Sequence, residues 1–231
     1  MTGLRGEGAR NGSAQDLTYR WLKRHIATLP RHGGTFLTES EVAQAAGTSR
    51  TPVREALLRL EAEGFLRIVP KKGAFVPPIS DGEVRSVMEA RHLVEDWCVR
   101  RIVPADTSFL TELDRLVDEQ GSLIDDSVAF IDCDRAFHRA IVAQAGNPVL
   151  AEFYESLRER QVRMGLHAVA NEENRTRTVL AEHAAIIAAL RSGEPARAGN
   201  ALATHLSSTL VALHLPDVAD WAAAQSITRL S

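Results

Sequence analysis

Four residues in the second half of the chain have the types and spacing that suit a metal ion: Asp134, His138, His183 and His205. Asp134 and His138 are four residues apart, so they share one face of a helix. His183 and His205 stand within apolar stripes, where a soluble helical bundle normally places leucine. A carboxylate and three imidazoles that converge would bind a divalent transition metal such as Zn²⁺ or Ni²⁺. The alternative is that each histidine is an ordinary hydrogen-bonded core residue.

A second group of side chains, in the string TSRTPVREALLRLEAEG, suits DNA. Arg50 and Arg54 are four residues apart and share one face near the start of a helix. In a helix-turn-helix this part of the second helix reaches the bases, and arginine matches the O6 and N7 atoms of guanine. Ser49, Thr48 and Thr51 add hydroxyls that suit phosphates. The alternative is an ordinary helix with arginines on its surface.

Cap and turn signals predict the helices that would position these DNA-facing residues. An apolar stripe that ends at Pro30 predicts a first helix. Thr38, with Glu41 three residues later, has the form of a capping box and predicts a second, short helix. Ser49 is expected to cap the third helix, which ends at Gly64.

Two short apolar segments, FLRIV and AFVPP, follow the third helix and flank a turn that contains Gly73. This pattern predicts a β-hairpin whose tip carries Lys71 and Lys72. A hairpin tip with two lysines suits the DNA backbone or a minor groove. Three helices followed by a hairpin predict a winged helix-turn-helix over residues 15–79.

Beyond Ser80 no strand signal appears, and residues 80–231 are expected to form an all-helical domain. Helical patterns cover residues 81–102, 107–120, 127–144, 148–167, 171–191 and 195–215, and a further short helix is expected within 217–231. Short connections between them predict an antiparallel bundle. The fold class is therefore mainly α, with the four candidate metal ligands on three helices of the bundle.

The charge distribution also indicates two domains. Residues 1–79 carry 12 Lys and Arg against 7 Asp and Glu, whereas the remainder carries 15 against 23. A basic segment joined to an acidic one suggests that the first domain faces a polyanion. Residues 1–14 are Gly-rich and polar, which predicts a disordered tail rather than a signal peptide. No apolar run is long enough for a membrane span, and the unpaired use of Cys98 and Cys133 fits a reducing cytoplasm.

The string SRTPVREAL, intact at residues 49–57, resembles the signature of the GntR family of bacterial regulators. The resemblance implies DNA contacts for Arg50, Thr51, Arg54 and the wing glycine Gly73. This sequence departs from the pattern at Ser40, where many relatives have a further DNA-contacting arginine. A serine cannot contact guanine in two places as arginine does, so the departure puts the operator sequence in doubt.

The stretches DRAFHRAIVAQAGNPVL and LAEHAAIIAALRSGEPARAGNALATHL resemble the FCD effector domain of the FadR branch of that family. Many FCD domains hold a metal with an aspartate, a histidine four residues later and two further histidines, and the four candidate ligands match these positions. The resemblance also implies a small carboxylate effector whose oxygen completes the metal shell. Arg91 stands where the resemblance implies a second contact with that acid, through an arginine side chain, and Arg163 is a weaker candidate for this contact. The alternative for Arg91 is a salt bridge to Glu95, four residues on.

The expected function is that of a ligand-responsive transcription factor, a repressor by analogy with the family. We expect a homodimer that binds a pseudo-palindromic operator in double-stranded DNA, with no membrane partner. Two other functions remain open at this point. A helical-bundle metalloenzyme would use the same ligands to activate water, and an architectural DNA-binding protein would need no ligand.

Overall fold

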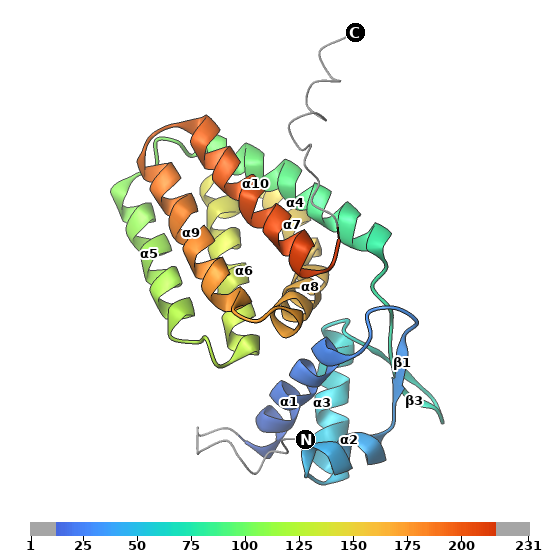
Figure 1. The fold of residues 1–231 in the computed structure, drawn as a ribbon. Coiled ribbons are helices and arrows are strands. Elements are labelled where there is room, and N and C mark those ends of the chain that lie inside the picture. The colour runs from blue at the N-terminus through green and yellow to red at the C-terminus, as the bar shows by residue number, and fades with distance from the viewer. Residues whose placement is uncertain (1–12, 216–231) are drawn as a thin grey trace. The chain divides into compact units, whose positions relative to one another are not determined.

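The computed structural model describes residues 13–215, and the chain divides into two compact units after Ser80. The first described helix, α1 (Ala14–Thr28), begins inside the expected N-terminal tail, with Ser13 as its N-cap. Residues 1–12 of that tail and the helix expected within residues 217–231 lie outside the described residues. The expected mainly α fold is confirmed, with one small sheet (Figure 1).

The first unit carries α1, α2 (Glu39–Ala46) and α3 (Arg50–Ala62), which pack on one another. The predicted capping box is present: Glu41 N donates to Thr38 Oγ1, and Thr38 N donates to Glu41 Oε2. Ser49 occupies the N-cap position of α3, but its side chain makes no capping hydrogen bond. Its hydroxyl is therefore not used to start the helix.

The wing is part of a three-stranded antiparallel sheet in the order β1-β3-β2. The predicted hairpin is formed by β2 (Arg67–Val69) and β3 (Gly73–Val76). No signal in the sequence predicted β1 (Thr35–Leu37), which pairs with the other side of β3. A three-residue strand is too short to display the alternation that marks strands.

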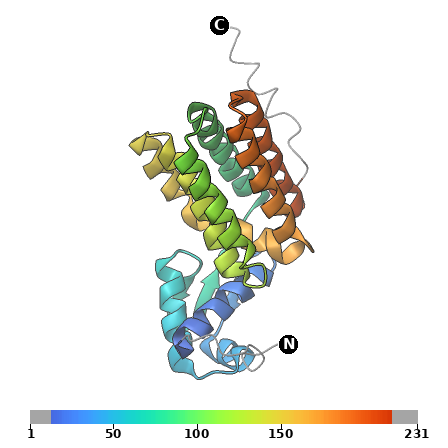
Figure 2. The ribbon, with the colours of Figure 1, turned by 90° about the vertical axis from the view of Figure 1, so that its left-hand side faces the viewer.

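The second unit is a helical bundle over the described residues 81–215. Its helices are α4 (Asp81–Arg101), α5 (Thr107–Gly121), α6 (Ser127–Gln144), α7 (Pro148–Ser156), α8 (Arg158–Asn171), α9 (Arg175–Arg191) and α10 (Pro195–Ala212). Helix α6 packs against α4, α5 and α8, and α10 packs against α4 and α9 (Figures 1 and 2). This arrangement brings inward-facing side chains of α4, α6, α9 and α10 to one place.

One predicted helix differs from the structure. The expected helix over residues 148–167 is two helices, α7 and α8, which meet at Leu157. No glycine or proline stands at that point, so the break had no composition signal. The break starts a new helix, α8, which contributes a wall to the cavity described below.

Candidate metal site and DNA-binding face

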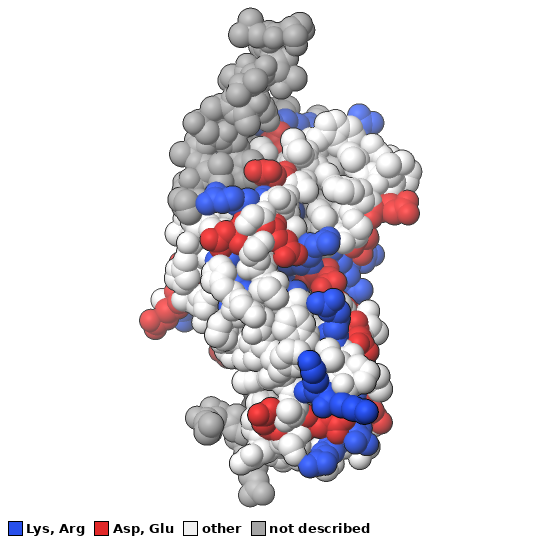
Figure 3. Space-filling view, turned by 90° about the vertical axis from the view of Figure 1, so that its right-hand side faces the viewer, with Lys and Arg blue, Asp and Glu red and all other residues white. Residues whose placement is uncertain are grey.

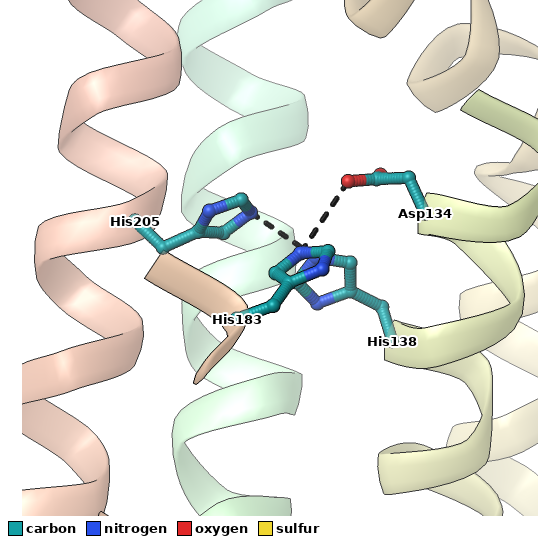
Figure 4. Close-up of side chains that lie close together, drawn as sticks. All are labelled: Asp134, His138, His183 and His205. Carbon is teal, nitrogen blue, oxygen red and sulfur yellow. Dashed lines mark hydrogen bonds and ion pairs between the residues drawn. The ribbon is translucent and has the colours of Figure 1, made fainter. Parts of the chain in front are cut away.

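The structure brings the four predicted metal ligands together inside the helical bundle (Figure 4). Asp134 and His138 come from α6, His183 from α9 and His205 from α10. One ligand atom of each residue lies within 4.8 Å of all the others. The three histidines are buried and Asp134 is partly exposed, so the cluster opens to a cavity on the aspartate side.

Two distances within the cluster match those between ligands of one ion. Nε2 of His138 lies 3.1 Å from Nε2 of His205, and Nε2 of His183 lies 3.4 Å from Oδ1 of Asp134. Two donor atoms that each lie about 2.0–2.1 Å from a shared ion are roughly 3.0–3.4 Å apart at ordinary coordination angles. The side chains therefore surround a space of the size of one metal ion.

Each histidine has an oxygen within 2.9 Å of its outer nitrogen, Nδ1. At His138 this contact has the distance of an ion pair but not the geometry of a hydrogen bond. Nδ1 of His138 lies 2.7 Å from Glu95 of α4, and Nδ1 of His205 lies 2.8 Å from Glu182 of α9. Nδ1 of His183 lies 2.9 Å from Oε1 of Gln120, at the end of α5. Metal-binding histidines in proteins usually have such an outer partner, which fixes the ring and its tautomer.

The outer partners decide where the imidazole protons sit. A carboxylate only accepts hydrogen bonds, so the proton of His138 and that of His205 belong on Nδ1. The Gln120 amide is oriented by donating from Nε2 to the carbonyl of Phe130, which leaves its oxygen for His183. All three Nε2 lone pairs then face inward. Two such lone pairs 3.1 Å apart repel each other unless a cation lies between them, so the residues present fit a metal ion.

The electrostatics of the cluster favour the metal-binding forms of these side chains. Burial lowers the pKa of His183 well below its ordinary value, and burial also lowers the pKa of His205. Both rings are therefore neutral near pH 7, as ligation requires. Burial alone would raise the pKa of Glu95, but Arg91 and His138 hold it well below the usual range. Glu95 is thus an ionised carboxylate in a fully buried position.

A cavity of about 30 Å³ adjoins the cluster. Asp134, His138 and His205 line it, together with Arg91, Arg135 and Arg175. Arg91 makes the alternative contact that its spacing suggested, an ion pair with Glu95 at 2.8 Å, and it lines the cavity as well. Arg163 is buried on α8 but is not among the residues that line the cavity.

The DNA-facing side chains lie on a separate, exposed surface of the first unit. Arg50, Thr51 and Arg54 are exposed on the first turns of α3, and Lys71 and Lys72 are exposed at the wing tip. Basic side chains gather there with acidic ones between them, as the lower part of Figure 3 shows. The arginines hold only surface partners: Arg50 donates to Ser40 at 2.7 Å, and Arg54 donates to Glu39 at 2.8 Å.

The wing turn explains why a glycine stands at position 73. Gly73 has a φ of 108°, and a Cβ atom there would collide with the carbonyl oxygen of Leu37 on β1. Lys71 also has a positive φ, of 63°, as the tight turn after Val69 requires. Gly73 therefore shapes the wing and allows β1 and β3 to approach, in addition to any contact its backbone makes with DNA.

Comparison with known proteins decides the family. The family model "Bacterial regulatory proteins, gntR family" matches residues 15–76, and the model of the FCD domain matches residues 86–208. The chain belongs to the GntR family. None of the helices described within residues 13–215 combines the length and the apolar composition that a membrane-spanning segment needs.

Its relatives within the GntR family are transcriptional regulators. An HTH-type regulator in an unstable DNA locus of Streptomyces ambofaciens is 33% identical over 81% of this chain and 80% of its own length. The HTH-type transcriptional repressor RspR of Escherichia coli is 29% identical over 81% of this chain and 83% of its own length. The solved structure of E. coli McbR/YncC has a TM-score of 0.57 at 27% identity, covering 88% of this chain and 98% of that one. The GntR-type chain is thus a DNA-binding transcriptional regulator and not an enzyme.

The sequence did not predict the residues that support the cluster from behind. Glu182, the neighbour of His183 on α9, holds His205. Glu95, expected as a partner of Arg91, also contacts His138 and accepts from Tyr154 at 2.7 Å. Gln120 and Arg175 had no signal, because their roles depend on which helices pack together.

Proposed function

We propose that this GntR-type regulator is a repressor that senses a small organic acid at a divalent metal ion, Zn²⁺ or Ni²⁺, held by Asp134, His138, His183 and His205. One observation carries the proposal: three buried histidines each have Nδ1 within 2.9 Å of an outer oxygen and Nε2 facing the centre. Such an arrangement is costly without a cation. A bound ion would offer a Lewis-acid position for a carboxylate oxygen.

The chain's own residues would receive and orient the acid. The cavity beside Asp134 gives it a place, and Arg91 lines that cavity as a candidate effector contact. Because Arg91 is already paired with Glu95, it would act as a local positive charge and as a link to α4 rather than as a free anion clamp. Arg163, away from the cavity lining, would at most act through its neighbours on α8.

The DNA-binding half would read an operator through α3 and the wing. Arg50 and Arg54 would contact base edges, with Ser49 and Thr51 on phosphates. Lys71, Lys72 and the wing glycine Gly73 would meet the backbone or a minor groove. Support comes from the exposure of these side chains and from membership of the GntR family, whose regulators bind DNA.

A homodimer would present two such heads to a pseudo-palindrome, since one recognition helix reads only a few base pairs. Helix α4 has exposed apolar side chains that a second copy would cover: Leu93 is 71% and Trp97 40% exposed. Asp96 and Arg100 flank them and offer charges of both signs, as a two-fold contact of one surface with itself requires. A Leu93→Asp change should shift the sedimentation of the protein to that of a monomer, whereas Val149→Asp, an equally exposed site on α7, should not.

The route from acid to DNA would run through α4. Glu95 of α4 contacts the ligand His138, and α4 follows directly on the segment Pro77-Pro78-Ile79-Ser80. Ile79 is buried in the first unit, where its N–H donates to the carbonyl of Arg31. A shift of Glu95 on ligand binding would therefore be passed along α4 to a segment anchored in the DNA-binding unit. Coupling between two sites of this kind is typically about 1–3 kcal/mol.

The test combines metal analysis with operator binding. Purified protein should contain about one divalent transition metal per chain, and His183→Ala or His205→Ala should lower both metal content and melting temperature. A library of small acids should yield one that raises the melting temperature and changes operator affinity, and His138→Ala should abolish both effects. Protein that stays metal-free after incubation with Zn²⁺ and Ni²⁺ would refute the ligand set. Acids that stabilise the protein but leave DNA binding unchanged would favour a ligand-independent architectural role.

A further inference from the structure

One polar side chain in the cavity has no partner among the described residues. Gln161 lies on the first turn of α8 and has a relative exposure of only 9%. It lines the same cavity as Asp134, His138 and His205. Its amide nitrogen Nε2 is buried and makes no hydrogen bond to any described part of the chain. Buried polar groups are almost always paired, so such an amide calls for an explanation.

The arginines and hydroxyl groups of the cavity contrast with Gln161 because they already have partners. Arg91 is paired with Glu95, Arg135 with Glu155 and Arg175 with Glu182. The hydroxyl of Tyr154 donates to Glu95, and that of Thr209 donates to the carbonyl of His205. Apolar side chains such as Met88, Ile131 and Val162 complete the wall. Two buried polar atoms of the described lining make no hydrogen bond, Nδ1 of His138 and Nε2 of Gln161. Nδ1 of His138 still lies 2.7 Å from Glu95, so the amide of Gln161 is the donor of the two that has no polar partner among the described residues.

The charge of the site indicates what kind of ligand would use that donor. With a divalent ion and Asp134 in place, one positive charge is left for a single carboxylate. Each arginine of the lining has its own glutamate, so a second carboxylate would find no unpaired cation among the described lining residues. A neutral amide donor instead matches a neutral acceptor, such as a hydroxyl or an oxo oxygen.

The size of the cavity limits the ligand further. A volume of about 30 Å³ corresponds to space for about two or three water molecules by the same measure. Gly165 of α8 packs closely on Ile131: a Cβ atom at position 165 would lie 3.0 Å from the Ile131 side chain. This wall therefore has little room to move back and enlarge the cavity. A short carbon chain fits such a space better than a long one.

Resting on the proposed function, we propose that the effector is a short monocarboxylic acid carrying a hydroxyl or oxo oxygen, and that Gln161 selects it by donating a hydrogen bond to that oxygen. The carboxylate would bind at the metal, and the second oxygen would meet the amide. A site that hydrogen-bonds a ligand oxygen rejects the analogue that lacks it, because the buried donor is then left unpaired. Gln161 would thus be the residue that tells lactate-like acids from propionate-like acids.

The experiment compares acids of equal carbon number on zinc-loaded, full-length protein by calorimetric titration. The pairs are glycolate with acetate, and lactate or pyruvate with propionate, with succinate as the dicarboxylate. Wild-type protein should prefer the oxygenated member of each pair, and succinate should bind no better than propionate. Gln161→Met, which keeps the length but removes the donor, should reduce the preference about five- to tenfold, the value of one hydrogen bond. Chelation of the ion by the second oxygen contributes equally in both proteins, so it cancels from this comparison.

Two further variants test whether the hydrogen-bond donor of Gln161 is the cause of the preference. Gln144→Met, at an exposed glutamine of α6, should leave the preference at the wild-type value. Gln161→Glu, which keeps the shape but only accepts hydrogen bonds when ionised, should weaken the oxygenated acids as Gln161→Met does. A preference that persists in Gln161→Met, or a succinate affinity above that of lactate, would overturn this inference and leave the metal and acid proposal standing. Zinc-loaded wild-type protein that binds none of these acids would overturn both.

Discussion

Two arginine–glutamate pairs of the same length show how differently the two domains use charge. Arg54 lies 2.8 Å from Glu39 in the DNA-binding domain, and Arg91 lies 2.8 Å from Glu95 in the FCD domain. The side chains of the first pair are 64% and 34% exposed, whereas those of the second are 8% and 0% exposed. The first pair is in water and can be exchanged for phosphates and bases. The second pair is buried, and separating its two charges would cost a large amount of free energy.

This difference reflects what each site has to do. A DNA-reading surface meets its partner from outside, so its arginines need only weak contacts in the free protein. The candidate metal cluster has its charges inside the bundle, so every polar group there would have to be held before an ion could bind. We therefore expect substitutions in the FCD domain to change stability strongly, and substitutions on α3 to change DNA binding with little effect on stability.

The largest effect is expected for Glu95→Gln. This change removes the buried counter-charge of Arg91 and weakens the contact with His138. Leaving one member of a buried pair uncompensated costs about 3–5 kcal/mol. Urea denaturation in the presence of a chelator, which keeps metal binding out of the measurement, should show a loss of that size.

A double variant checks the physical reason. Arg91→Met combined with Glu95→Gln removes both charges, so it should lose less stability than the sum of the two single changes. Additive losses, or a loss below about 1 kcal/mol for Glu95→Gln alone, would mean that the pair is hydrated in solution. The contrast between the two domains would then disappear.

The next largest effect is expected at Gln120, which holds His183 from behind without being a ligand. Gln120→Met removes the acceptor for Nδ1 and keeps the length of the side chain. Outer partners of metal ligands typically contribute about 10- to 100-fold to metal affinity. Competition with a chromophoric chelator should show a loss in that range, with all four ligands still present. An affinity equal to that of the control Gln144→Met would show that Gln120 has no orienting role.

The sequence predicted which candidate ligands would meet in one cluster but not the residues that support them, and the reason lies in distance along the chain. Asp134 and His138 are one turn apart, so their common face follows from helix geometry alone. Glu95 and His138 meet only because α4 and α6 pack with one particular rotation about their axes. Nothing local in either helix specifies that rotation. Polar side chains such as Gln120 and Gln161 also look like surface residues until the fold buries them.

Helix starts were predicted where the sequence carries a local signal, such as a capping residue at Thr38 or a proline at Pro195. Thr38 and Glu41 form the expected capping box, because both partners lie within four residues of each other. The break at Leu157 is marked by no glycine or proline, and the helix after it has no side-chain cap, so the sequence read as one helix. The placement of Gln161 depends on that break.

A smaller effect is expected on the DNA side, and it should leave stability unchanged. Arg54→Ala should cost about 1–3 kcal/mol at the operator and relax specificity at one base pair, because it removes a contact with a base edge. Lys71→Ala should weaken all sequences alike and reduce the dependence of binding on salt, because a lysine at the wing tip would meet phosphates. Fluorescence anisotropy with operator and mismatched duplexes at several salt concentrations measures both. Wild-type operator affinity in Arg54→Ala would refute the base-reading role of α3.

The smallest effect, and the most direct test of the contrast, is expected for Glu39→Gln. It makes the same chemical change as Glu95→Gln, at an arginine the same 2.8 Å away, but in an exposed pair. Exposed ion pairs contribute about 0–1 kcal/mol, and a carboxylate in the first turn of α2 adds a similarly small dipole term, so the loss of stability should stay below about 1–2 kcal/mol. Operator affinity should instead rise severalfold, because Arg54 no longer has to leave a partner and one negative charge near the phosphates is gone. In an Arg54→Ala background only the second of these gains remains, so Glu39→Gln should help less there.

A fall in operator affinity would mean that Glu39 itself accepts a hydrogen bond from a base, as a glutamate can from cytosine. The exposed pair would then be part of the DNA-reading surface. The two domains would differ in the burial of their ion pairs, but the glutamate of each pair would have a fixed binding role.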